Sequence, residues 1–226
     1  MAIPRLERLI MNLEYARNQM LRQQVRAWEV LNDRVLQVLG AVPRERFVPP
    51  AYHDVAFGDF EIPIGHNQVM MTPMVEGRLL QSLQVERADR VLEIGTGSGF
   101  LTACLARLCN SLVSIDIFPE FVDSAKRKLE HIGINNAELS VADALELERN
   151  DEFDAIAVTG SLPELNEHFI RMLRPGGRLF VVTGRPPIME SQLITLHAPN
   201  NWSVQSLFET VLTPLINAEK PAPFVL

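Results

Sequence analysis

The segment Val91–Phe100 carries the residue pattern with the clearest chemical meaning in this chain. It reads VLEIGTGSGF, an apolar run with Glu93 near its end, followed by a glycine at every second position. A strand that leaves a sheet through such glycines can bring its backbone close to a ligand, because glycine has no Cβ atom. The pattern therefore indicates a ligand-binding loop or, on a plainer reading, only a tight turn between a strand and a helix.

The spacing of the glycines narrows the choice of ligand. The dinucleotide pattern G-x-G-x-x-G is absent because position 100 is phenylalanine, and no lysine follows the last glycine as a P-loop would require. An uncharged or zwitterionic nucleoside remains, and Glu93 can face an ammonium group. S-adenosyl-L-methionine fits this description, and the predicted contacts to it are Glu93, Gly95, Thr96, Gly97, Ser98 and Gly99.

Acidic residues also follow the next two expected strands. Ser111–Ile117 contains Asp116 about 20 residues after the loop begins, where a carboxylate can accept hydrogen bonds from ribose hydroxyls. Ala137–Val141 is followed by Asp143, which we expect to meet the adenine amino group. Each acid alone could be a helix cap or a solvated charge, but their repetition at strand ends favours a binding edge. The other residues expected at this edge are Ile117, Ala144 and Thr159.

The order of expected elements predicts an α/β fold. From Arg90 onward strands alternate with helices, which is typical of a doubly wound, mostly parallel, Rossmann-like sheet. Phe153–Thr159 is a fourth strand and Arg178–Thr183 a fifth, preceded by a turn at Arg174–Gly177. Two further strands, Ser191–Leu196 and Ser203–Val211, follow without an intervening helix and should form a C-terminal antiparallel edge.

The first 72 residues are expected to differ from the rest. Residues 5–30 have apolar positions at helical spacing, Asn32 can cap a helix over Asp33–Val42, and residues 43–72 are expected to be irregular. Thr72 and Pro73 then fit the N-cap and first position of another helix. The tail from Pro214 to Leu226 is expected to pack across the domain without regular structure.

Composition excludes several classes of protein. The net charge is −7, with no apolar run of the ~20 residues that a membrane span needs and no signal-peptide core, so we expect a cytoplasmic protein that binds no membrane. Residues 51–226 carry 13 basic and 23 acidic residues, which argues against a nucleic-acid partner. Cys104, Cys109 and the scattered histidines have no metal-binding spacing, so no metal site is expected.

The whole pattern resembles the class I methyltransferases and, within them, the protein-L-isoaspartate O-methyltransferase family. The likeness spans nearly the whole chain. Its more specific parts are VPRERFVPPAY, at residues 42–52, and EIPIGHNQVMMTPMV, at residues 61–75. Less specific are the glycine loop, VSIDIFPE, FDAIAVTGSLPEL and LRPGGRLFVVTG, while residues 212–216 are similar to a closing V-P-L segment of the family.

The resemblance implies an S-adenosyl-L-methionine-dependent carboxyl O-methyltransferase acting on peptides or proteins that bear isoaspartate, as a monomer or homodimer. The fold would comprise N-terminal helices and a lid segment (1–72) and a cofactor-binding domain (73–226), packed as one compact unit. The lid would hold the isoaspartyl group against the methyl donor. Its implied substrate contacts are Ile64, Gly65, His66, Gln68, Met70 and Pro73, with Met71 and Thr72 at the reacting position.

One lid position departs from the family pattern. Members usually carry a small hydroxyl residue in Q-x-x-S-x-P, where this chain has Met71, and Thr72 one residue later can already be occupied as a helix cap. Met71 could weaken activity, select another acceptor or serve only packing. Three functions therefore remain open: isoaspartyl repair, methylation of a different carboxylate or small molecule, or cofactor binding without turnover. Thr159-Gly160-Ser161-Leu162 lacks the motif of nucleic-acid amino-methyltransferases.

Overall fold

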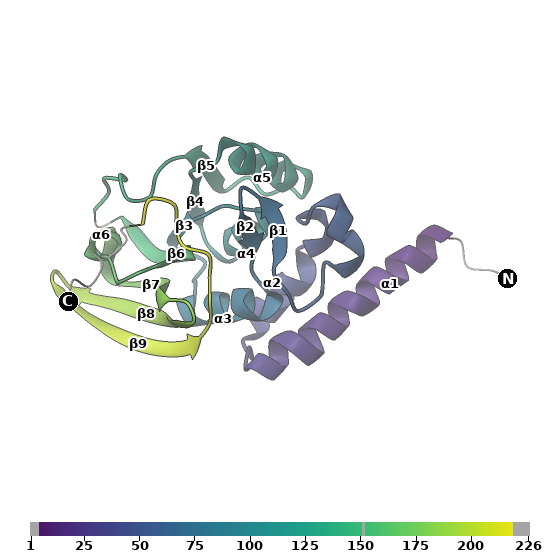
Figure 1. Cartoon of the computed structure of the whole chain (residues 1–226), viewed down its shortest axis with the longest axis horizontal. Helices are drawn as coiled ribbons and strands as arrows, with labels where there is room; N and C mark the ends of the chain where they lie inside the picture. Colours follow the sequence, from purple (N-terminus) through teal and green to yellow (C-terminus); the bar gives the residue numbers. More distant parts are fainter. Residues whose placement is uncertain (1–4, 151, 219–226) are drawn as a thin grey trace.

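The computed structural model describes residues 5–150 and 152–218, which form a central sheet with helices packed against it (Figure 1). The N-terminal part contains helices α1 (Arg5–Gln19) and α2 (Asp33–Ala41) and strands β1 (Ile62–Gly65) and β2 (Gln68–Met70). The remainder contains helices α3 (Pro73–Leu83), α4 (Phe100–Leu108), α5 (Pro119–His131) and α6 (Glu167–Arg171). Its strands are β3 (Arg90–Ile94), β4 (Ser111–Asp116), β5 (Ala137–Val141), β6 (Phe153–Leu162), β7 (Leu173–Arg185), β8 (Ile188–Ala198) and β9 (Asn201–Glu209).

The main sheet has the order β5-β4-β3-β6-β7-β8-β9. Strands β3 to β7 are mutually parallel, and β8 and β9 add an antiparallel edge. This arrangement confirms the predicted doubly wound sheet with its antiparallel C-terminal edge. The chain runs outward from β3 through β4 to β5 and then returns to place β6 on the other side of β3. Ligands bind at such a switch point, outside the carboxyl ends of the strands.

Both faces of the sheet are covered because successive strand residues are apolar and point to opposite faces. On β3, Val91 belongs to the core that packs under α3, α4 and α5, whereas Leu92 belongs to the core on the side of α6. The first core also receives side chains from α2 and from the chain between α2 and α3. Packing therefore joins residues before position 72 to the sheet, and Figure 1 shows α1 projecting away from this body.

Helix α3 shows how the sequence determines an element that positions the site. Thr72 has extended backbone angles and its Oγ1 accepts a hydrogen bond from Val75 N at 3.4 Å, while Pro73 occupies the first turn. These are the roles predicted for both residues. The N-terminus of α3 therefore begins directly where the β1–β2 hairpin ends.

Three sequence predictions differ from the structure in detail. Residues 5–30 do not form one continuous helix, because α1 passes into a wider π-helical stretch, Met20–Val25, in which both end residues are buried, and then into a 3-10 turn. The segment expected to be irregular, 43–72, contains two 3-10 turns and the β1–β2 hairpin. The Arg174–Gly177 turn lies within β7, as a bulge between the pairs Phe153–Leu173 and Ala155–Arg178.

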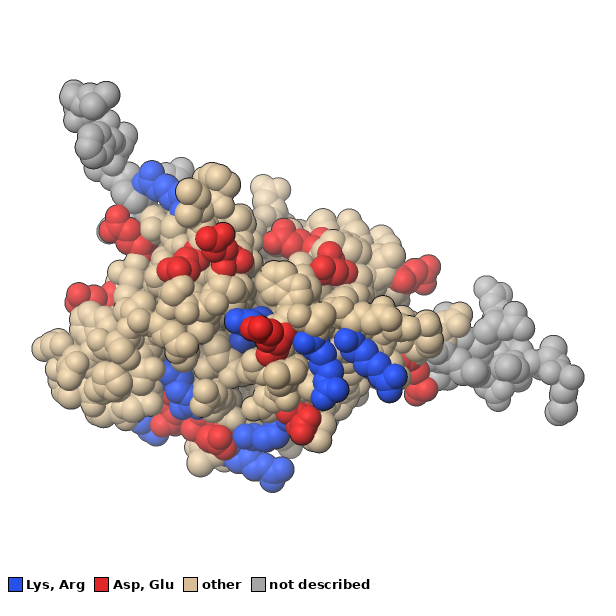
Figure 2. Space-filling view, turned by 90° about the horizontal axis from the view of Figure 1, so that it is seen from below, with Lys and Arg blue, Asp and Glu red and all other residues tan. Residues whose placement is uncertain are grey.

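The surface carries charges of both signs. On the face seen in Figure 2, Lys and Arg side chains are intermingled with Asp and Glu and form no continuous basic field. Within the described ranges, every helix is too short or too polar to cross a membrane.

Candidate active site

A cleft of about 770 Å³, including the part open to solvent, lies at the carboxyl ends of β3, β4 and β6. The described residues that line it include Asp116 and Asp143 but no lysine or arginine. An acidic cleft without basic groups suits a cationic ligand with hydroxyl and amino groups and is unsuited to a polyphosphate.

The glycine loop forms the floor of this cleft. Gly95 and Gly97 both have positive φ, +96° and +50°, which disfavours any residue with a Cβ atom. A Cβ atom on Gly95 would collide with Thr159 Oγ1, which donates to Ile94 O (2.9 Å) and Gly95 O (2.8 Å). A Cβ atom on Gly97 would lie 3.3 Å from Ile64 Cδ1 of the hairpin. The loop thus leaves its backbone open to a ligand, between β6 and the hairpin.

Asp116 ends β4 and is almost fully buried, with 7% of its surface exposed. Its Oδ2 accepts from Gly97 N (2.8 Å) and its Oδ1 from Phe118 N (3.0 Å). Burial raises the pKa of this carboxyl, and the backbone donors of Gly97, Phe118 and Ile117 oppose that shift. Each oxygen keeps a further lone pair, so the carboxylate can accept hydrogen bonds from a vicinal diol.

Asp143 follows β5 on the same edge. Its Oδ1 accepts from Leu145 N (2.9 Å), and its Oδ2 accepts from Asn217 Nδ2 (2.7 Å) near the end of the described chain. The carboxylate is therefore held in a fixed orientation at the cleft. An exocyclic amino group could meet it there.

The β1–β2 hairpin covers the cleft from the side of α3. Ile64, Gln68, Val69 and Met71 line the cleft, whereas Met70 is buried in the core beside it and does not. His66, at the hairpin tip, packs outside the cleft.

A C-terminal strap of residues 212–216 closes the remaining side, and Ser161 at the end of β6 anchors it. Ser161 Oγ donates to Leu212 O (2.8 Å), Ser161 N donates to Thr213 O (3.0 Å), and Leu215 N donates to Ser161 O (3.0 Å). The strap was not among the predicted site residues, although its similarity to a V-P-L segment was the signal that could have identified it. Other lining residues missed from the sequence are the apolar Phe118, Phe121 and Leu145.

The structure brings together most of the residues predicted for the site. Those that line the cleft are Ile64, Gln68, Met71, Gly95, Gly97, Asp116, Ile117, Asp143, Ala144 and Thr159. Those that do not are Gly65, His66, Met70, Thr72, Pro73, Glu93, Thr96, Ser98 and Gly99. Each residue of this second group lies within two positions of a lining residue in the sequence.

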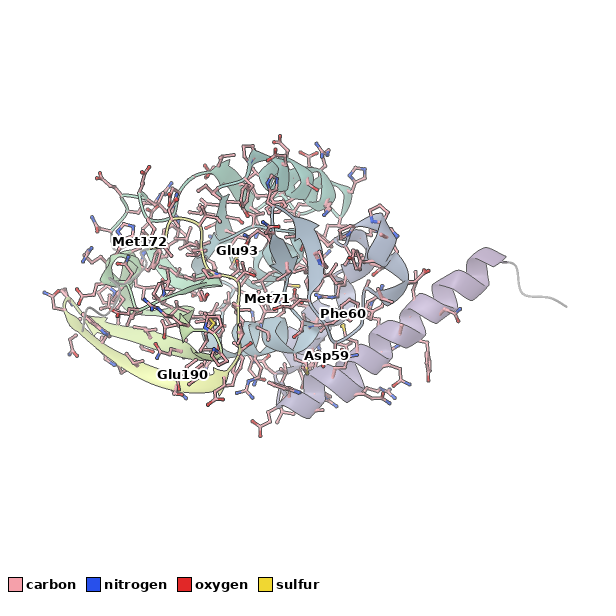
Figure 3. All side chains as sticks on the ribbon, in the orientation of Figure 1. Asp59, Phe60, Met71, Glu93, Met172 and Glu190 are labelled. Carbon is pink, nitrogen blue, oxygen red and sulfur yellow. The ribbon has the colours of Figure 1, made fainter. Side chains whose placement is uncertain are left out.

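The prediction for Glu93 was wrong, because its side chain does not reach the cleft. Its side chain is completely buried between α4 and β4, in the centre of the molecule (Figure 3). Its Oε2 accepts from Thr102 Oγ1 (2.6 Å) and Ser114 Oγ (2.6 Å). Alternation along β3 sends this side chain to the face under α4, away from any ammonium group of a ligand. Ser114 also pairs with Thr96 Oγ1 (2.6 Å), so Glu93 supports the loop from beneath.

A parallel sheet with a glycine loop after its first strand and acidic residues after the next two defines a class I methyltransferase. The family model "Protein-L-isoaspartate(D-aspartate) O-methyltransferase (PCMT)" matches residues 15–220. The chain is 30% identical over 210 residues to protein-L-isoaspartate O-methyltransferase 2 of Pelobacter propionicus, covering 92% of this chain and 93% of that protein. It is 36% identical over 180 residues to the protein-L-isoaspartate O-methyltransferase of Methanospirillum hungatei, covering 79% and 83%. The chain belongs to the protein-L-isoaspartate O-methyltransferase family.

A solved structure has the same fold over most of the chain. A protein described as a protein-L-isoaspartate O-methyltransferase of Plasmodium falciparum, in complex with S-adenosyl-L-homocysteine, superimposes with a TM-score of 0.77. The match covers 87% of this chain and 96% of that one at 19% identity. At this identity the match supports the fold, including the antiparallel edge.

Proposed function

We propose that this chain is an S-adenosyl-L-methionine-dependent O-methyltransferase that methylates the carboxylate of L-isoaspartyl residues in damaged proteins. The observation that carries the proposal is the meeting of the glycine loop, Asp116 and the lid hairpin around one acidic cleft. Family membership supplies the substrate class. The product would be a methyl ester, which favours closure to a succinimide and partial return to normal aspartate.

The residues present fit the cofactor. The backbone of Gly95 and Gly97, which lines the cleft, would lie against its methionine and ribose portions. Asp116 would accept hydrogen bonds from the ribose hydroxyls, and Asp143 from the adenine amino group. When bound, S-adenosyl-L-methionine supplies a methyl group activated by its sulfonium and leaves as S-adenosyl-L-homocysteine once the carbon–sulfur bond has broken.

The acceptor needs orientation more than chemical activation. A carboxyl group of the aspartyl type, with a pKa of about 4, is already ionised at neutral pH, so no general base is required. The task of the lid is to place one carboxylate oxygen in line with the methyl carbon and to exclude water. Ile64 and Met71 provide apolar walls for this purpose, and Gln68 offers an amide at the same opening. We propose that residues 1–72 and 73–226 act together as one unit in this step.

The test is methyl transfer to a synthetic peptide that contains one L-isoaspartyl residue. S-adenosyl-L-homocysteine release is measured against the same peptide with normal aspartate, after calorimetry has established cofactor binding. Turnover of the isoaspartyl peptide alone supports the proposal. Tight cofactor binding without turnover of either peptide would contradict it and direct attention to another acceptor.

A further inference from the structure

Arg44 is a buried residue that has no role in methyl transfer as described above. Its side chain is completely buried, and its guanidinium donates to groups from three segments of the chain. Nε donates to Ala56 O (2.9 Å), Nη2 donates to Met71 O (2.8 Å), and Nη1 pairs with the carboxylate of Glu76. A buried guanidinium is costly unless its donors find partners, so this arrangement requires every one of these acceptors to stay in place.

The partners of Arg44 come from the lid and from the helix that follows the glycine loop. Met71 follows β2, ends the lid hairpin and lines the cleft. The guanidinium carbon of Arg44 also lies 4.7 Å from the centre of the Phe100 ring. Phe100 is the first residue of α4, directly after the glycine loop. One side chain therefore contacts both the acceptor lid and the element that begins at the cofactor loop.

A second link connects the same segment to the loop. The Phe47 ring packs edge-on against Phe100, with centroids 5.8 Å apart. Lys128 Nζ, from α5, donates to both Phe47 O (3.1 Å) and Ser98 O (3.1 Å). The chain from Arg44 to Phe47 is thus fixed to the glycine loop, which gives Arg44 a rigid base from which to hold the lid.

We propose that Arg44 is a positioning residue for methyl transfer, which sets the acceptor lid at a fixed distance from the glycine loop through its hydrogen bond to Met71 O. This inference rests on the proposed function. A planar guanidinium can hold three acceptors in one geometry, whereas a lysine presents a single ammonium point. Because an error of ~1 Å in placing a reacting group can cost ~100-fold in rate, losing this hydrogen bond should slow turnover more than it weakens binding.

The experiment removes both buried charges together. Arg44→Met alone would leave the Glu76 carboxylate unpaired and could prevent folding, so the informative variant is Arg44→Met/Glu76→Met. The matched control is Arg178→Met/Asp89→Asn. Arg178 also donates to backbone carbonyls, Leu83 O and Gln84 O, and to a carboxylate, but at the edge of the sheet opposite the cleft. Arg44→Lys tests whether a positive charge alone can hold the lid without the planar guanidinium that reaches three acceptors at once.

Three quantities are measured on folded protein: the Kd for S-adenosyl-L-homocysteine, kcat on the isoaspartyl peptide, and amide hydrogen exchange in residues 62–71. For Arg44→Met/Glu76→Met we expect a Kd within about 3-fold of wild type, a kcat lower by about 10- to 100-fold, and lid exchange faster by about 10-fold or more. Arg44→Lys should recover only part of kcat. The control should lose thermal stability but keep kcat and lid exchange.

The outcomes separate this inference from the proposed function. Unchanged kcat and unchanged lid exchange in the double variant would overturn the positioning role, as would an equal loss of kcat in the Arg178 control. If the wild type does not turn over the peptide, the proposed function fails, and lid exchange still decides whether Arg44 holds the hairpin. Unchanged exchange would then overturn the inference on its own, and faster exchange confined to residues 62–71 would support it.

Discussion

The ring of His66 is stacked on the ring of Phe118, with centroids 4.2 Å apart and planes inclined by 18°. His66 lies at the tip of the lid hairpin, and Phe118 lines the cleft two residues after Asp116. Phe121 packs edge-on against both rings. The tip of the lid is therefore docked on the loop that carries the carboxylate proposed to bind ribose, while Arg44 holds the other end of the hairpin.

The stacking predicts that His66 helps to retain the cofactor. An aromatic pair contributes about 0.5–1.5 kcal/mol beyond its buried area, so His66→Ala should raise the Kd for S-adenosyl-L-homocysteine by about 2- to 12-fold. Stopped-flow dissociation should place the change mainly in the release rate. His131→Ala is the control, because His131 lies exposed on α5 and, among the described residues, its ring is hydrogen-bonded to Arg127 O of its own helix. Equal dissociation rates in both variants would show that the stack does not restrain the lid.

Asp116→Ala should weaken cofactor binding strongly. The change removes the carboxylate that is proposed to accept from ribose and also leaves Gly97 N without its acceptor. A loss of about 1–3 kcal/mol corresponds to a Kd about 5- to 150-fold higher by calorimetry. The exposed Asp123 provides the control, as Asp123→Ala. A folded Asp116→Ala variant with wild-type affinity would remove the ribose role from this residue.

The burial of Glu93 predicts a pH dependence of stability. Burial raises the pKa of Glu93 from 4.5 to about 8, against the hydrogen bonds of Ser114 and Thr102. The folded protein then binds this proton more tightly than the unfolded chain does. The contribution of Glu93 to the free energy of unfolding is therefore full below about pH 4.5, falls as the pH rises towards 8, and stays low above it.

Glu93→Gln should remove this dependence while keeping the shape of the side chain. Urea unfolding at pH 5, 6.5 and 8 should show the wild type losing more free energy of unfolding over this range than the variant. Glu76, whose pKa burial raises to about 7 against the effect of Arg44, titrates in both proteins, so the difference between the two profiles is what reports on Glu93. Parallel pH profiles for the two proteins would mean that Glu93 is ionised in the folded state.

The sequence predicted the sheet, and the meeting of Asp116 and Asp143 at one cleft, because both depend on local patterns. Apolar runs with Asp116 and Asp143 at their ends identify parallel strands and their ligand edge from a few residues each. Glu93 was misplaced because its position at a strand end suggests the cleft, whereas the alternation of side chains directs it under α4. The contacts of Arg44 and the anchoring of the C-terminal strap by Ser161 join residues far apart in the chain, and no local pattern reveals them.

Met71 occupies the lid position at which relatives of this family are expected to carry a hydroxyl residue. Its side chain lines the cleft, and Arg44 fixes its backbone carbonyl, so a shorter side chain there should keep the same backbone position. Thr72 does not stand in for the missing hydroxyl, because it caps α3 at Val75 N and is not among the residues that line the cleft. Met71→Ser would supply a donor to the substrate, and a hydrogen bond to a charged group contributes about 1.5–3 kcal/mol. We expect kcat/KM for the isoaspartyl peptide to rise about 10-fold or more, with some loss of thermal stability from the smaller buried side chain.

Met71→Ala controls for size alone, because it opens the cleft without adding a donor. If Met71→Ser and Met71→Ala change kcat/KM equally, or if both lower it, the thioether is part of the acceptor site and the missing hydroxyl is not what limits turnover.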